Sequence, residues 1–488
     1  MSADAPEPSL ATFQLVARFL RSHNLTSTLD ALLHEADPRL AAQIDRPPAD
    51  SGNDLQDVVE DWIAQRLSRL RVDDPSAAPL EQLRQLEVRG KLPDRVRTAV
   101  KEATNVLSVT RGTLPRRSWD SSELRFRSEH IPCIFTTAVD RSLKVYSADS
   151  FELLDSFSLP SPALSIVQHP QDEQARYIAC ATMEGSLSVI DLVTREVKVK
   201  AKDHTKYIVR VTWSSDGRYL VTLGYDKLVQ VYRFSLSAAS FADAPALLDD
   251  EAPDPLALNP AVSLKLVKSV NTRTNPEAAV FLPDSRWLVY SAREDHLLHY
   301  LEMPAEGGED KEDWREKTYN LNENGDEFVS FSILYITLHP TLPLLSLQTS
   351  TTNARLLLYP FHSPTRLLTV HTTASQSDYF NPRHAWLPSG AAAVVNSEDG
   401  LVRIVDLAGR VRVCQGAHGP AAPLELPPGE EGSETDELRS ERARARREAD
   451  KGSSVIRDVE VLPCGPALEE VRVLSCGFDK TVKVMETA

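Results

Sequence analysis

The sequence predicts an all-β fold of seven small sheets, preceded by a shorter α-helical region. Three observations carry this prediction. Turn residues recur at regular spacing over residues 105–488, short β-rich runs flank each turn, and the first hundred residues show helical periodicity instead. Turn signals that bound short strands at such intervals are typical of all-β proteins, and repeats of this length are typical of ring-forming arrays. The predicted architecture is therefore a seven-bladed β-propeller.

The clearest repeat covers residues 203–232. It contains His204, a turn at Asp216-Gly217, a strand with Thr222, a second turn at Asp226 and a strand that ends on Tyr232. The first turn of each predicted blade lies at Arg127-Ser128-Glu129, His169-Pro170-Gln171, Ser215-Asp216-Gly217, Pro283-Asp284-Ser285, His339-Pro340, Pro388-Ser389-Gly390 and Pro463-Cys464-Gly465. The second turn of each lies at Asp140, Glu184, Asp226, Asp295, Asn353, Asp399 and Asp479.

The repeats resemble those of the WD-repeat (WD40) family over roughly the last three quarters of the chain. In that family a His, a Ser or Thr, an Asp and a Trp form a hydrogen-bonded set inside a blade. The resemblance implies this structural role for His204, Thr222 and Asp226, with Tyr232 in the place of the Trp. In the other blades the His is missing or displaced. The resemblance also implies a platform for other proteins, although a fold alone does not determine function.

The end of the chain supplies a prediction about ring closure. The last predicted strand, 481–486, is only the third of its blade, and an unpaired sheet edge is a liability that natural proteins avoid. We expect residues 105–110, which precede the first blade, to pair with it and close the ring. The propeller would then span 105–488, with loop insertions near 237–262, 304–317 and 419–452.

Residues 1–36 predict a helical hairpin that resembles the LisH motif, a two-helix dimerisation unit. Asn24 separates the two helices, and Thr26 is placed to cap the second. The residues that the resemblance assigns to dimerisation are Leu15, Val16, Phe19, Leu20, Leu25 and Leu32, and Thr28 and Glu35 also match the motif. Two short helices cannot bury an adequate core alone, so we expect a homodimer.

Residues 37–104 predict a helical linker region. Apolar residues keep helical spacing from Leu55 to Leu70. A further helical pattern runs through Leu80, Leu83 and Leu86 and, after Pro93, continues at Val96 and Val100.

Composition narrows the classes of function. The net charge of −16 argues against a nucleic-acid partner, because phosphate neutralisation needs clustered Lys and Arg. Five cysteines without a C-x-x-C pair suit a reducing compartment. The chain shows no secretory signal in its first residues and no apolar run of membrane-spanning length. We therefore expect no membrane association and a cytoplasmic or nuclear location.

No catalytic, cofactor or metal motif is found in the sequence. His296 and His299 lie three apart on a predicted strand and therefore point to opposite faces, which disfavours a shared metal. His204, Thr222 and Asp226 have the residue types of a hydrolase triad, but a triad is defined by geometry and role. In the WD-repeat family, partners commonly dock around the residues that precede each blade's first strand, which the resemblance places at Tyr207, Tyr379, Phe380 and Arg457.

The sequence favours a non-enzymatic dimeric scaffold that binds proteins on its propeller face. An alternative, also suggested by the resemblance, is a substrate-recruiting subunit of a ubiquitin ligase complex. A third is an enzyme with its site in the propeller channel. Convergent polar groups with perturbed ionisation in that channel would favour the third hypothesis.

Overall fold

The computed structural model divides the chain into two compact units, residues 1–78 and 79–488. It describes residues 16–17, 20–21, 25–35, 77–121, 125–237, 256, 259–304, 314–322, 326–352, 354–377, 380–418, 454–464 and 470–487.

The first unit contains helical residues at 16–17 and 20–21 and the helix α2 (Thr26–Glu35). The Leu25 amide donates to the Leu20 carbonyl at 2.9 Å, and α2 begins at the next residue. Leu25 itself is exposed, whereas Leu20 is buried. Two predicted dimerisation residues, Leu15 and Phe19, and the predicted helix at residues 55–70 lie outside the described residues.

The second unit is built from antiparallel four-stranded sheets, and seven of them lie in the described part of the chain. Blade 1 contains β2 (Val106–Asp120), β3 (Arg125–Ala138), β4 (Ser142–Ser147) and β5 (Leu153–Ser158). Blade 2 contains β6 (Ala163–Gln168), β7 (Tyr177–Thr182), β8 (Leu187–Asp191) and β9 (Glu196–Ala201), with a short 3-10 helix at Asp172–Gln174. Blade 3 contains β10 (Ile208–Trp213), β11 (Tyr219–Gly224), β12 (Leu228–Leu236) and β13 (Val262–Asn271).

Blade 4 contains β14 (Pro276–Phe281), β15 (Trp287–Ala292), β16 (Leu297–Glu302) and β17 (Glu316–Asn320). Blade 5 contains β18 (Ile333–Leu338), β19 (Leu344–Thr349), β20 (Arg355–Pro360) and β21 (Leu368–His371). Blade 6 contains β22 (His384–Trp386), β23 (Ala392–Val395), β24 (Leu401–Asp406) and β25 (Val411–Gly416). Blade 7 combines β26 (Ile456–Cys464), β27 (Glu470–Gly477) and β28 (Thr481–Glu486) with β1 (Arg95–Lys101).

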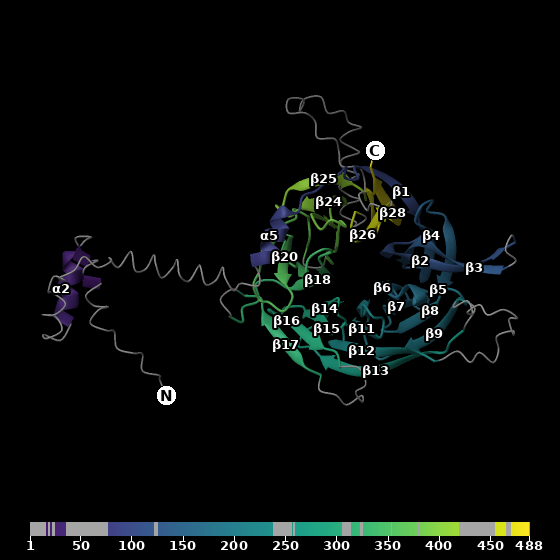
Figure 1. The fold of residues 1–488 in the computed structure, drawn as a ribbon, viewed down its shortest axis with the longest axis horizontal. Helices are drawn as coiled ribbons and strands as arrows, with labels where there is room; N and C mark the ends of the chain where they lie inside the picture. The colour runs from purple at the N-terminus through teal and green to yellow at the C-terminus, as the bar shows by residue number, and fades with distance from the viewer. Residues whose placement is uncertain are drawn as a thin grey trace, which may run out of the picture. The chain divides into compact units, whose positions relative to one another are not determined.

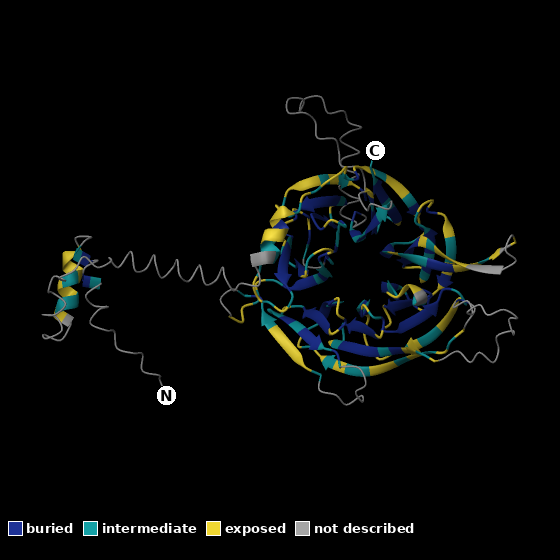
Figure 2. Ribbon diagram, viewed as in Figure 1, coloured by how far each residue is buried: buried dark blue, intermediate teal, exposed yellow. Residues whose placement is uncertain are grey.

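The sheets stand around a central axis, so that the second unit is the predicted seven-bladed propeller (Figure 1). The second strands of blades 2 to 5 are buried along their whole length, whereas fourth strands such as β17 and β25 are largely exposed. Burial therefore falls from the inner strands to the rim (Figure 2). The predicted insertions near 237–262 and 419–452 fall mostly outside the described residues, and the one near 304–317 ends earlier because β17 begins at Glu316.

The ring is closed by β1 rather than by residues 105–110, which corrects the sequence prediction. β1 pairs antiparallel with β28, from Arg95 opposite Glu486 to Lys101 opposite Thr481. Val106 instead begins β2, the first strand of blade 1. The propeller thus starts about ten residues earlier than predicted, inside the segment assigned to the helical linker.

The helical interpretation of Val96 and Val100 failed because residues four apart also share a face of a regular strand, so this spacing does not distinguish a helix from a strand. A register shift between Thr98 and Val100 interrupts β1. Val96 packs against the cluster between blades 6 and 7, and Val100 lies in the cluster between blades 7 and 1. One bulged strand thereby contributes apolar side chains to two blade interfaces.

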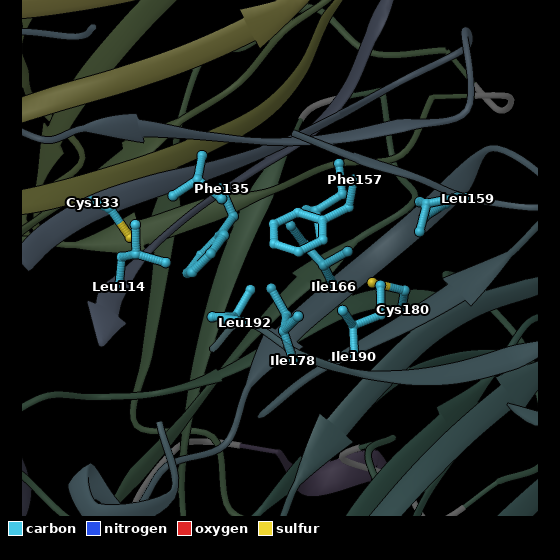
Figure 3. Close-up of a cluster of buried hydrophobic side chains, with 13 residues drawn as sticks. Leu114, Cys133, Phe135, Phe157, Leu159, Ile166, Ile178, Cys180, Ile190 and Leu192 are labelled. Atoms are coloured by element: carbon cyan, nitrogen blue, oxygen red, sulfur yellow. The ribbon is translucent and has the colours of Figure 1, made fainter. Parts of the chain in front are cut away.

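The hydrophobic core is divided among the interfaces between blades. Seven clusters of buried side chains each combine residues of two neighbouring sheets, so every sheet packs against another on both faces. Figure 3 shows the cluster between blades 1 and 2, where Phe135 and Phe157 meet Ile166 and Ile178. A single blade, with two apolar faces, cannot bury them without its neighbours.

Two histidines bridge adjacent blades through turn glycines. His169 of blade 2 lies 3.1 Å from the carbonyl oxygen of Gly217 in blade 3, and His339 of blade 5 lies 3.0 Å from that of Gly390 in blade 6. Both glycines have positive φ, and a Cβ at either one would meet the imidazole ring at under 2.5 Å. Glycine is therefore required at both turns.

The helix α5 (Ala77–Gln85) confirms the helical pattern predicted through Leu80 and Leu83. Leu83 is buried in a cluster with Leu344 and Leu358 of blade 5. Among the helices that the structure describes, none is long and apolar enough to cross a membrane.

Removing β1 should destabilise the propeller far more than removing the residues before it. We expect a chain that begins at residue 103 to melt about 10 °C below one that begins at residue 93, because it loses the β28 ladder and the burial of Val96 and Val100. Differential scanning calorimetry of the two truncations measures this difference. Equal melting temperatures would contradict the closure by β1.

Candidate protein-binding face and channel mouth

The blade 3 hydrogen-bond network brings together three of the residues singled out in the sequence. His204 Nδ1 lies 2.9 Å from Asp226 Oδ1, and His204 Nε2 lies 2.8 Å from Thr222 Oγ1. The Thr205 amide donates to the second carboxylate oxygen of Asp226 at 2.8 Å. Gly224 leaves the space for this network, because a Cβ there would meet His204 Nδ1 at 2.2 Å. The network ties the turn before β12 to the segment that leads into β10.

Tyr232 belongs to an adjoining network. Its hydroxyl lies 3.1 Å from an Asp203 carboxylate oxygen and 2.5 Å from Gln230 Oε1, and Gln230 in turn donates to the Asp203 carbonyl at 2.9 Å. Burial and the nearby Asp203 raise the pKa of Tyr232 well above its usual range. Tyr232 thus supports the same segment as His204 does, through a different set of atoms.

Blade 7 contains a second network of the same kind that sequence reasoning missed. His418 Nδ1 lies 2.8 Å from Asp479 Oδ1, and His418 Nε2 lies 2.8 Å from Ser475 Oγ. His418 and Ser475 are 57 residues apart in the chain, so the regular repeat spacing does not connect them. The sequence feature that could have revealed this network is the Ala417-His418 pair, which lies at the end of blade 6, directly before the long insertion.

Neither network has the features of a hydrolytic site. The side chains of Thr222 and Ser475 are buried, so neither hydroxyl is accessible to a substrate. Burial alone would raise the pKa of Asp226, but its hydrogen bonds to His204 and Thr205 lower it. The carboxylate therefore stays ionised and anchors the turn.

His299 forms an ion-pair cluster in blade 4 rather than a metal site. Its Nε2 lies 2.9 Å from Asp295 and its Nδ1 3.2 Å from Glu316, and its ring stacks on Tyr290 at 4.8 Å. Burial lowers the pKa of His299, but the two carboxylates outweigh it and raise the pKa to about 9. Across the described residues, no group of three His, Cys, Asp or Glu side chains is placed to hold a metal ion.

Tyr207 belongs to one side of the propeller, which we call the narrow face. It is formed by the residues that precede each blade's first strand and by the turns between second and third strands. Here Tyr207 stacks on Tyr225, with ring centroids 4.4 Å apart, and Tyr207 is 36% exposed. The Tyr225 hydroxyl donates to Glu277 at 2.7 Å, and Arg293 pairs with the same carboxylate at 2.6 Å. The aromatic pair is thereby fixed in place at the surface.

The other predicted docking residues do not form an exposed aromatic site like that of Tyr207 within the described part of the chain. Phe380 is only 4% exposed, so its side chain is not available to a partner. Tyr379 lies outside the described residues. Arg457 lies in β26, the innermost strand of blade 7. The structure also shows Phe328, in the loop between β17 and β18, with 71% exposure, which the sequence analysis did not single out.

One layer of side chains surrounds the mouth of the channel, near the narrow face. Six of the blades contribute to this layer the residue that directly follows a bulge at the start of their first strand. Blade 6 contributes Arg383, whose backbone hydrogen-bonds to Asn396 at the corresponding place in the sheet. From blade 1 to blade 7 the layer is Ser108, Ser165, Arg210, Ala278, Tyr335, Arg383 and Asp458. Two hydrogen bonds link layer residues to a neighbouring blade: Ser108 of blade 1 donates to Asp458 of blade 7 at 3.0 Å, and the Val211 amide of blade 3 donates to Ser165 of blade 2 at 3.2 Å.

Tyr335 is the centre of the charged half of this layer. The guanidinium carbon of Arg210 lies 4.7 Å from the Tyr335 ring centroid, and that of Arg383 lies 4.6 Å from it. Below this layer a cavity of about 500 Å³ is lined by Tyr335, His384, Arg111 and Glu460, among others. Burial raises the pKa of Glu460 to about 7 and, together with Arg383, lowers that of His384 to about 3.

Substitution of Asp226 should test the structural role of the blade 3 network. We expect Asp226→Ala to lower the free energy of unfolding by about 2 kcal/mol, because it leaves the buried His204 nitrogen and the Thr205 amide without their acceptor. Urea denaturation followed by circular dichroism measures the loss. The matched control Asp149→Ala removes an 86% exposed carboxylate and should change stability little. Equal losses would rule out the network as the cause.

His299 should make stability depend on pH in the alkaline range. Its folded-state pKa is raised to about 9 from 6.5, so its stabilising effect is fully present below about pH 6.5 and is lost as the pH rises through about 9. We expect wild type and His299→Gln to differ most in unfolding free energy near pH 6 and least near pH 10. The exposed His130→Gln serves as the control. A difference that is constant over this range would contradict the assignment.

Comparison with known families agrees with the blade geometry. Residues 196–233 match the sequence profile of the family described as WD domain, G-beta repeat. The matched segment runs from β9 to β12 and contains the complete network of His204, Thr222 and Asp226. Residues 196–233 are thus similar to one WD repeat, and they span the last strand of blade 2 and most of the first three strands of blade 3 in the seven-bladed propeller.

Proposed function

We propose that this protein is a non-enzymatic scaffold that binds partner proteins on the narrow face of its propeller. WD-repeat propellers are generally protein-interaction scaffolds, and the observation that carries the proposal here is the Tyr207–Tyr225 pair. Tyrosine is favoured at energetically dominant interface positions because it offers a rigid apolar ring together with a polar group. The buried Glu277 and its partner Arg293 hold the pair in one orientation, so little ordering is needed when a partner binds.

We further propose that the N-terminal unit makes the scaffold a homodimer. The apolar side chains of Leu29, Leu32 and Leu33 share one face of α2 and are only half-buried. A second copy would cover such a face, and a closed two-fold contact is the commonest way to do so. Two propellers in one dimer would raise the apparent affinity for a partner with two binding segments.

The proposed location is the cytoplasm or the nucleus. All five cysteines are free, and Cys133, Cys180 and Cys476 are buried as small apolar groups. Free thiols of this kind suit a reducing compartment.

Loss of the aromatic pair should reduce partner binding. We expect Tyr207→Ser to lower the recovery of co-purifying proteins by about tenfold, since a hot-spot side chain contributes about 1–2 kcal/mol. Affinity purification of the full chain with quantitative mass spectrometry provides the measurement. Leu153→Ser, which removes a 55% exposed apolar side chain from the outer strand β5, is the matched control. If both variants recover the wild-type set of proteins, the narrow face is not the binding surface.

Charged residues on the apolar face of α2 should separate the dimer. We expect Leu29→Glu with Leu32→Glu to give monomers with an unchanged propeller melting temperature, because two carboxylates cannot be buried in an apolar contact. Sedimentation velocity measures the state of association. The control Ser27→Glu with Ala31→Glu places the same charges on the exposed side of the helix. A double Leu variant that remains dimeric would contradict the proposal.

A further inference from the structure

Three arginines gather at the channel mouth, a concentration of positive charge in a chain whose net charge is −16. Arg210 and Arg383 both lie against the ring of Tyr335, at 4.7 Å and 4.6 Å. Arg457 lies one residue before Asp458 of the same layer and is close enough to Arg210 and Arg383 for their charges to repel. Burial and this repulsion lower the pKa of Arg383 to about 9, so that it still carries its proton at neutral pH.

The small side chain of Ala278 explains how charges from distant blades meet. Ala278 occupies the blade 4 position of the layer, between Arg210 and Tyr335. Because it is small, Arg210 of blade 3 reaches the Tyr335 ring of blade 5. The aromatic ring then holds two guanidinium groups from blades 3 and 6 in place through cation–π contacts.

The acidic groups of the channel contact blade 1 and form no ion pair with these arginines, although Asp458 is close enough to attract Arg383 and Arg457. Asp458 accepts hydrogen bonds from the Ser108 hydroxyl at 3.0 Å and the Val109 amide at 3.2 Å, both in blade 1. Glu460 lies 3.8 Å from Arg111, also of blade 1. Within the described residues, no carboxylate lies within 4.0 Å of Arg210, Arg383 or Arg457.

The arginines also keep unused hydrogen-bond donors. Arg383 is only 8% exposed, and its guanidinium donates to the carbonyl of its own neighbour, Pro382, at 2.9 Å. Arg210 has a buried terminal nitrogen without a hydrogen-bond partner. Buried donors are normally satisfied, so this Arg210 nitrogen is available to a ligand that supplies an acceptor.

We propose that the channel mouth binds the phosphate group of a phosphorylated serine or threonine in a segment of a partner protein. Three guanidinium groups and one carboxylate leave a local charge of about +2, which a phosphate monoester balances at neutral pH and a single carboxylate does not. The guanidinium fork also matches the geometry of phosphate oxygens. Arg210 and Arg457 are partly exposed near the narrow face and would be contacted first, with Arg383 beneath them.

This inference rests on the proposed protein-binding function of the same face. Arg457 also lies near the Tyr225 hydroxyl, close enough for an electrostatic influence between them, so the aromatic pair and the arginines border one surface. A partner segment could place apolar residues on Tyr207 and Tyr225 while its phosphate enters the channel mouth.

The test measures binding of fluorescein-labelled peptide pools to the full-length chain by fluorescence anisotropy. One pool carries phosphoserine or phosphothreonine at the central position between degenerate residues, and matched pools carry unmodified serine or glutamate there. We expect the phosphorylated pool to bind at least about tenfold more tightly than either. We expect Arg383→Met and Arg457→Met to abolish this preference, and Arg457→Lys, which keeps the charge and loses the fork, to retain part of it.

Controls distinguish recognition of a phosphorylated peptide from an effect on folding and from binding of a small phosphate compound. Arg286→Met removes the same charge from a 64% exposed arginine that pairs with Glu302 on the rim, and should leave binding unchanged. Melting temperatures should not fall in the channel variants, because removing one of several clustered cations relieves repulsion. Equal binding of the three pools overturns the inference. The inference is also overturned if inorganic phosphate or pyrophosphate stabilises the protein in an Arg383-dependent way while the phosphorylated pool shows no preference. That result would identify a small phosphate compound as the ligand.

The outcome is also independent of the test of the proposed function. If Tyr207→Ser loses its co-purifying proteins while phosphorylated and unmodified pools bind equally, protein binding on the narrow face stands and phosphate recognition fails. If neither Tyr207→Ser nor the arginine variants change binding, the proposed protein-binding function and the proposed phosphate recognition both fail.

Discussion

The structure depends on contacts between neighbouring blades. Each sheet has two apolar faces, and the buried side chains form seven clusters that each join two sheets. No blade can satisfy both faces unless the array closes, so closure is the condition under which the whole core is buried. β1 meets this condition by completing the sheet of blade 7, and its bulge directs Val96 and Val100 to the two interfaces that flank the closure.

The same constraint explains which features of the fold can be predicted from sequence. The turns and the β-rich runs are local signals, and they identified seven blades and the network of His204, Thr222 and Asp226. The closing strand is a non-local pairing, and Arg95–Lys101 carries no turn or alternation that marks it as part of blade 7. His418 was missed for a related reason: an insertion separates it from Ser475, and only the folded sheet restores their contact.

The binding residues were predicted less well than the fold because their role depends on radial position in the ring. Tyr207, Phe380 and Arg457 occupy similar places in the sequence of their blades, yet one is exposed on the narrow face, one is buried, and one lies in the channel. The strand pattern shows where a blade begins but not which neighbouring loop covers that point. Tyr335 and Arg383 carry no motif at all, and only the alignment of seven sheets places them in one layer.

The layer of side chains at the channel mouth differs from the hydrophobic clusters in the kinds of side chain that it contains. Its member Ala278 also belongs to the hydrophobic cluster between blades 4 and 5, whereas Arg210, Tyr335, Arg383 and Asp458 lie outside the seven clusters. The positions of the layer that lie outside the clusters can be charged or aromatic without loss of the core, provided that their polar groups are satisfied. The side chains of Asp458 and Ser165 are satisfied within the ring, through Ser108 and the Val211 amide. One buried guanidinium nitrogen of Arg210 is not, and a buried donor without an acceptor is costly in a stable fold. A ligand that supplies the acceptors resolves this cost, and for that reason the charged half of the layer, rather than the blade networks, is the part of the channel that points to a binding role.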